Sequence, residues 1–173
     1  MRVMPRFVSR LPGTVVQTLG VRPGEKVIAW GSGPGAESDQ PAFTAATYQA
    51  LYSQALGRRI PWDRISKATW EDPILEVVVL DGTDRPSSPV RVRLDDARDL
   101  PAAVHDRVTG SVVVSERADL GNEQWVQMIA RRGSDDDAIR WSLVFDAGLD
   151  PDDPLLRAAA DAALVRYRDA LGI

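Results

Sequence analysis

The sequence feature that most limits the fold is a succession of strand patterns with no helix between them. Residues 74–82, "ILEVVVLDG", and residues 90–94, "VRVRL", are β-branched segments joined by the loop "TDRPSSP". In the second segment Val90, Val92 and Leu94 alternate with two arginines, and this period of two predicts one buried and one solvent-facing side. Neighbouring parallel strands need a long crossover, which is usually a helix. The sequence therefore predicts antiparallel strands in this region.

Three earlier segments extend the same pattern. "EKVIAW", residues 25–30, predicts a strand that ends in an aromatic residue. "AFTAATYQALYSQAL", residues 42–56, contains alanines that allow a helix, but its alternation and the pair Tyr48 and Tyr52 favour a hairpin of two strands. "RRIPWDRISKATW", residues 58–70, predicts a turn around its Pro-Trp-Asp and then a strand.

Helix signals occur at three places. "SRLPGTVVQTLGVRPG", residues 9–24, predicts a short helix that ends near Gly20. "DLPAAVHDRVTG", residues 99–110, predicts a helix that Asp99 caps and whose buried stripe is Leu100, Val104 and Val108. The last helix is predicted from Pro151 onward, with an apolar stripe made of Leu156, Ala160, Ala163, Leu164, Tyr167 and Leu171.

The order of these elements predicts the fold class. Between the second and third helices lie three strand patterns, "SVVVSERADL", "EQWVQMIARR" and "IRWSLVFD". The chain is therefore expected to be an α+β protein. We expect a helical arm over residues 1–19, a bent antiparallel sheet with a closing helix over 20–115, and a three-stranded sheet with a helix over 111–173. The last two regions are expected to pack as one compact unit.

Composition excludes several classes of function. The formal net charge is −4, so the whole chain offers no positive field that would collect nucleic acid or anionic lipid. The chain has no cysteine, which excludes disulfides, thiolate metal sites and a cysteine nucleophile. The acidic runs "SDDDA" and "LDPDDP" lack the ligand spacing of a calcium loop, and the second suits a helix cap. No cofactor or metal is predicted. The first twenty residues lack the apolar run of a signal peptide, and a cytoplasmic location is expected.

The glycine segment "GSGPG", residues 31–35, has two interpretations. It resembles the first motif of S-adenosylmethionine-dependent methyltransferases, in which Gly31, Gly33 and Gly35 would let the backbone approach the cofactor. The sequence lacks the Lys-Ser/Thr of a phosphate loop, and the place about 20 residues on, where other nucleotide folds carry an acid, is "LYSQ". A loop joining two antiparallel strands is the favoured interpretation, and a small methyltransferase is the first alternative.

The second half has a further interpretation as an RNA-binding domain. Its order of helix, three strands and helix matches double-stranded-RNA-binding domains, which need basic residues near the start of the final helix. That start contains Asp150, Asp152 and Asp153, which would repel phosphate, so nucleic acid is a disfavoured partner. His105, the single histidine, lies within a predicted helix and is interpreted as a structural residue.

Several segments together resemble a known group of domains. "TAATYQALYS", "RRIPWDRISKATWED" and "LEVVVLDG" resemble bacterial pleckstrin-homology-like and GRAM-like domains. These segments, with "LPAAVHDRVTGSVVVS" and "DPDDPLLRAAADAAL", look most like a set of uncharacterised actinobacterial proteins of similar length. The resemblance implies a strongly bent antiparallel sheet closed by a helix, a scaffold generally used for binding. Lipid-binding members use basic residues in the loop between the first two strands, and "GSGPGAESDQP" contains none.

The resulting hypothesis is a non-enzymatic binding or adaptor protein whose partner is another protein or a small ligand. Tyrosine, tryptophan and arginine often dominate binding surfaces. The residues predicted to form such a surface are Tyr48, Tyr52, Arg58, Arg59, Trp62 and Trp70.

Overall fold

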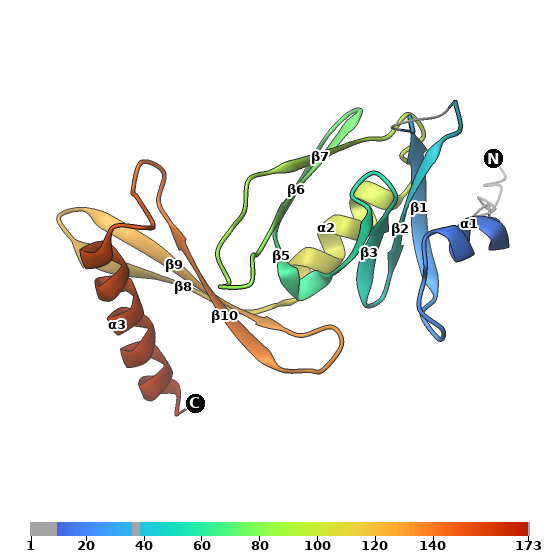
Figure 1. The fold of residues 1–173 in the computed structure, drawn as a ribbon. Coiled ribbons are helices and arrows are strands. Elements are labelled where there is room, and N and C mark those ends of the chain that lie inside the picture. Colours follow the sequence, from blue (N-terminus) through green and yellow to red (C-terminus); the bar gives the residue numbers. More distant parts are fainter. Residues whose placement is uncertain (1–9, 36–38, 173) are drawn as a thin grey trace, which may run out of the picture.

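The computed structural model describes residues 10–35 and 39–172. In these residues helices accompany three antiparallel sheets, so the predicted α+β class is confirmed (Figure 1). The first sheet has the order β1 (Val27–Gly33), β2 (Ala42–Thr47), β3 (Ala50–Ser53), β4 (Arg58–Pro61). The second has the order β5 (Ile65–Glu71), β6 (Ile74–Val79), β7 (Val90–Arg93), and the short 3-10 helix η1 (Trp62–Arg64) separates it from the first.

The glycine segment leads from one strand to an antiparallel neighbour, as predicted, but Gly31, Ser32 and Gly33 belong to β1 itself and not to the loop. Gly31 is opposite Thr44 and Gly33 is opposite Ala42 in the β1–β2 pair. A Cβ atom on Gly33 would lie 1.9 Å from the carbonyl oxygen of Arg93, and one on Gly31 would lie 2.9 Å from that of Asp96. Both glycines are therefore needed, because residues 93–97, at the end of β7 and just beyond it, cross β1 so closely that a Cβ atom has no room.

Helix α2 (Leu100–Gly110) completes the core of this first part of the chain. Leu100, Val104 and Val108 are buried, as predicted from their spacing, and pack with apolar residues of both sheets. The prediction that Asp99 caps the helix is wrong. Its side chain accepts no capping hydrogen bond, because its backbone (φ −89°, ψ 4°) lacks the extended conformation of a capping residue.

Two local predictions near the N-terminus are confirmed. Helix α1 (Gly13–Thr18) precedes Gly20, which has a φ of 65°. Two helix residues, Val15 and Val16, and Leu19 just after the helix pack against a small cluster around Trp30 on β1. Residues 42–56 form the hairpin of β2 and β3 and not the helix that their alanines would allow.

The C-terminal part of the chain has its own sheet and its own core. Strands β8 (Val112–Gly121), β9 (Gln124–Arg132) and β10 (Ile139–Phe145) pair in the order β10-β9-β8, and α3 (Pro154–Leu171) packs on one face. Asp153 caps α3, as predicted for this acidic run, by accepting hydrogen bonds from the backbone N–H groups of Leu155 and Leu156. The helix begins at Pro154 and not at Pro151, because Asp153 is its cap.

One residue of the predicted α3 stripe is not buried. Leu171 is exposed, because the last turn of the helix, beyond Tyr167, contributes nothing to the second core. The rest of the predicted stripe is buried or packs against that core.

We refer to residues 10–110 as the first unit and residues 112–171 as the second unit. Figure 1 shows the second unit extending to one side of the first, beyond the C-terminal end of α2. The core of the first unit contains all the buried residues of α2, so α2 and α3 do not cover the same sheet. The predicted order of a helix, three strands and a helix is present as α2, β8, β9, β10 and α3, but only α3 contributes to the core of the three-stranded sheet.

Polar contacts join the two units. Arg131 on β9 is only 3% exposed and donates hydrogen bonds to the carbonyl oxygens of Val108 (3.1 Å) and Ser66 (2.8 Å) and to Oγ of Ser111 (2.9 Å). In the β9–β10 loop, the backbone N–H of Ser134 donates to Asp63 at 3.0 Å. The two hydrophobic cores share no residue, so hydrogen bonds and ion pairs hold the second unit in place.

Candidate functional site

The predicted aromatic surface does not exist as a single patch. Trp62 is only 2% exposed and packs in the first core, where its indole N–H donates to the carbonyl of Thr47 at 3.0 Å. Tyr52 is also buried, and its hydroxyl accepts a hydrogen bond from the backbone of Arg22. Tyr48, in contrast, is 54% exposed. Expecting Trp62 and Tyr52 at the surface was wrong, because η1 and β3 turn both side chains inward.

The two predicted arginines have different environments. Arg58 is exposed on β4. Arg59 is enclosed by Glu25 (2.8 Å) and Asp135 (2.6 Å), and its Nε donates to the hydroxyl of Tyr52 at 3.0 Å. Burial alone would lower the pKa of Arg59, but the hydrogen bonds to Asp135, Glu25 and Tyr52 outweigh burial and raise the pKa. Arg59 therefore holds the β9–β10 loop against the first unit.

Two of the three glycines of the alternative cofactor site, Gly31 and Gly33, face the chain itself, whereas Gly35 lies with Gly33 in the wall of a cavity of about 540 Å³ that also contains Asp39, Asp95 and Asp96. The backbone of residues 93–97 covers Gly31 and Gly33 on the side where a side chain would project, and the amide of Ser32 bonds the carbonyl of Asp96 at 2.9 Å. No helix begins within the described residues between β1 and β2.

A groove lies between β5 and α2, and we call it the β5–α2 groove. Its volume is about 570 Å³. Trp70, the remaining predicted aromatic residue, is half-buried in its wall. The residues that line it are Ala68, Thr69, Trp70, Glu71, Leu75, Pro101, Ala102, Val104, His105 and Asp106.

Strand β5 contributes more than side chains to this groove. Among the described strands it pairs only with β6, so it is an outer strand of its sheet, and its consecutive residues 68 to 71 line the groove. The outer edge of a strand presents unpaired N–H and C=O groups that are able to pair with another strand. At the beginning of β5, Arg131 already donates a hydrogen bond to the carbonyl oxygen of Ser66. The edge available to another strand therefore begins after Ser66.

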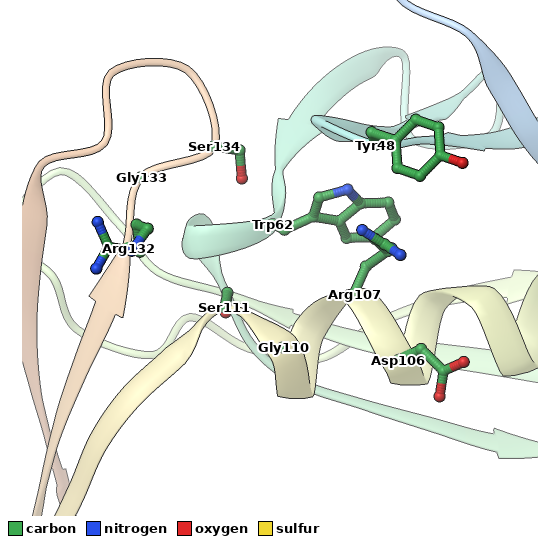
Figure 2. A pocket seen from close by; sticks show the side chains of 9 residues that line it. All are labelled: Tyr48, Trp62, Asp106, Arg107, Gly110, Ser111, Arg132, Gly133 and Ser134. Carbon is green, nitrogen blue, oxygen red and sulfur yellow. The ribbon is translucent and has the colours of Figure 1, made fainter.

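A second cavity lies where the two units meet, and we call it the junction pocket (Figure 2). Its volume is about 250 Å³. Figure 2 shows Arg107 projecting from α2 toward Trp62 and Tyr48, and its guanidinium carbon is 5.0 Å from the centre of the Tyr48 ring. The lining residues are Tyr48, Trp62, Asp106, Arg107, Gly110, Ser111, Arg132, Gly133 and Ser134.

The two cavities lie on opposite flanks of α2, with the exposed Asp106 between them. His105, exposed on α2, lines the groove. The described residues contain no cluster of three or more side chains suited to hold a metal ion. They also include no helix that combines the length and the apolar character needed to cross a bilayer.

Comparison with known proteins found no match among family models, curated proteins or solved structures. The site is therefore interpreted from its own geometry. Sequence reasoning found Trp70, Tyr48 and Trp62 but missed Ala102 and Arg107. Both residues lie on α2 outside its buried stripe of Leu100, Val104 and Val108. Such positions have no pattern in the sequence that would mark them as part of a site.

Proposed function

We propose that this chain is a non-enzymatic, cytoplasmic protein-binding module with a pleckstrin-homology-like scaffold in its first unit. The succession of a four-stranded sheet, a three-stranded sheet and a helix supports this proposal, because the resemblance of the sequence implies strands closed by a helix. The partner is an extended peptide segment of another protein, which binds in the β5–α2 groove.

One observation carries the proposal: the free edge of β5 lies directly beside an apolar groove. An extended peptide adds to such an edge through main-chain hydrogen bonds, while every second side chain enters the groove. Leu75 and Val104 form the buried floor of the groove, and Trp70 provides a flat apolar wall. This arrangement supplies both elements of recognition, a backbone template and a receptor for side chains.

The groove also indicates the kind of peptide it accepts. Its interior is apolar, so alternate residues of the peptide are apolar. The charged residues that line the groove are Glu71 and Asp106, so negative charges face the other half of the peptide side chains and favour polar or basic residues there. An extended segment that alternates apolar and polar residues fits this combination.

The test is selection from a phage-displayed library of random linear peptides, followed by Kd measurement on the peptides obtained. Ala102 is exposed at the groove, so Ala102→Trp fills the groove without disturbing the core and should weaken binding at least about ten-fold. Thr109→Trp is the matched control, because Thr109 is exposed further along α2 and does not line the groove.

A second arm tests the added strand. Two N-methylated versions of each peptide are compared, one methylated at its odd-numbered residues and one at its even-numbered residues. Only one version loses the backbone donors that face β5, and only that version should fail to bind. Selected peptides that bind Ala102→Trp as tightly as the parent, or that bind in both methylated versions, would contradict the proposal.

A further inference from the structure

The junction pocket is a separate cavity, built from both units. Tyr48 lies in the turn between β2 and β3, Trp62 in η1, and Arg107 in the last turns of α2. Ser134, in the loop after β9, forms the opposite wall (Figure 2). A molecule in this pocket therefore touches segments that are far apart in the sequence and belong to two different cores.

Among the described residues that line this pocket, Arg107 is a cation without an ion pair, and Asp106 is an anion without one. No ion pair that includes Arg107 forms within residues 10–35 and 39–172, and its guanidinium lies over the Tyr48 ring. Figure 2 shows the carboxylate of Asp106 pointing away from Arg107 and Trp62. Stacking on an aromatic face leaves the hydrogen-bond donors of a guanidinium available around its edge.

Two further arginines lie near Arg107, and the carboxylate of Asp63 is already paired. Arg131 donates hydrogen bonds to the carbonyl oxygens of Val108 and Ser66 and to the hydroxyl of Ser111, which are all neutral groups. Asp63, the nearest buried acid, is already paired with Arg140 at 3.2 Å and accepts from the backbone of Ser134. Arg132, 55% exposed at the outer wall, is only loosely paired with Asp137 at 3.5 Å. An anion in the pocket would therefore meet a favourable field.

The shape and the lining define the ligand further. The cavity of about 250 Å³ is smaller than the usual pocket for a drug-sized molecule. Its polar side chains include the hydroxyls of Ser111 and Ser134, and its exposed apolar surface is the ring of Tyr48, since Trp62 is only 2% exposed. A guanidinium binds carboxylate and phosphate oxygens through parallel hydrogen bonds.

We propose that the junction pocket binds a small organic anion, with its carboxylate or phosphate on Arg107 and its apolar part against the exposed ring of Tyr48. This site is independent of the β5–α2 groove, because it lies on the other flank of α2. Occupation of the pocket brings the turn after β2, helix α2 and the β9–β10 loop into contact with one ligand.

The experiment is an NMR titration of the whole chain with benzoate, phenyl phosphate, inorganic phosphate and benzyl alcohol. We expect saturable shifts of the amides of Gly110, Ser111 and Gly133 with at least one of the two aromatic anions. The two anions distinguish carboxylate from phosphate as the preferred group, and inorganic phosphate shows whether the ring is required. Benzyl alcohol carries the ring without a charge and should produce no saturable shift.

Arg107→Gln should weaken the binding at least about ten-fold, and Arg58→Gln, which removes an exposed arginine elsewhere, should leave it unchanged. Ala102→Trp should also leave it unchanged, which separates this site from the peptide groove. The proposal is overturned if neither aromatic anion produces a saturable shift up to about 20 mM, a limit far weaker than ordinary ligand affinities. It is also overturned if benzyl alcohol binds equally well or if Arg107→Gln binds like the parent.

Discussion

Arg59 on β4 and Asp135 in the β9–β10 loop are 76 residues apart in the sequence, and their Nη2 and Oδ1 atoms are 2.6 Å apart. Glu25 and Tyr52 hold the same guanidinium from the other side. This ion pair fixes the loop that forms one wall of the junction pocket. It therefore contributes to the attachment of the second unit, together with the contacts of Arg131 and Asp63.

The attachment should depend on pH. The hydrogen bond from Arg59 holds the pKa of Asp135 below the ordinary value of 3.8. A depressed pKa in the folded state gives stability that is present above the unfolded value and is lost as the pH falls through the folded value. Asp135→Asn should therefore cost less than about 1 kcal/mol at neutral pH, because the pair is partly exposed. The difference from the parent should shrink below a pH of about 3.8.

Urea unfolding of the parent and Asp135→Asn at a series of pH values measures this difference. Asp169→Asn is the control, since Asp169 is exposed near the end of α3, and it should show no such pH dependence. A constant difference between parent and Asp135→Asn down to a pH of about 3 would contradict the assignment.

Gly33→Ala should destabilise the first unit by about 3 kcal/mol or more. The added methyl group would lie 1.9 Å from a backbone oxygen of Arg93, and a backbone cannot move aside as a flexible side chain can. Gly13→Ala is the control, because a Cβ there meets nothing within 4 Å, and it should change stability by less than about 1 kcal/mol. Thermal or urea unfolding compares the two, and equal stabilities would refute the backbone crossing.

Arg131→Met should cost about 3 kcal/mol. The substitution keeps most of the volume but leaves the buried carbonyl oxygens of Ser66 and Val108 without their donor. Arg132→Met, one residue further on, removes a mostly exposed guanidinium and should cost less than about 0.5 kcal/mol. Urea denaturation of both variants is the measurement, and a small effect of Arg131→Met would show that the two units are held by other contacts.

Asp153→Ala should weaken α3 by about 1 kcal/mol, because two backbone N–H groups lose their acceptor. Hydrogen exchange of the α3 amides is the sensitive readout, since the loss acts on the second unit. Protection in the first unit should remain at the parent level. An equal loss of protection in both units would mean that the two units unfold together in one cooperative step.

Most of the local structure could be predicted from the sequence, because its signals are local. The alternation of Val90, Val92 and Leu94 and the spacing of Leu100, Val104 and Val108 each specify one buried face, and both faces are buried as expected. The cap of α3 follows from an acid placed just before an apolar stripe.

The candidate sites depend on contacts that no local pattern records. A tryptophan after Ile-Pro suits an exposed turn as well as a buried one, and only the 3-10 helix η1 places Trp62 in the core. Gly31 and Gly33 match a cofactor motif, but the structure requires glycine at both positions because residues 93–97, more than 50 positions later in the chain, cross β1 there. The junction pocket requires Tyr48, Arg107 and Ser134 to meet, which depends on how the two units dock.

The two cores also occupy separate stretches of the chain. The first is built from residues up to Val108, and the second from Ala118 to Tyr167. During synthesis the first core therefore has all its parts before the ribosome has made any residue of the second, and domains that emerge first generally fold first. Arg131 then makes its hydrogen bonds to an α2 that has already formed, so the second unit docks on a first unit that is already folded.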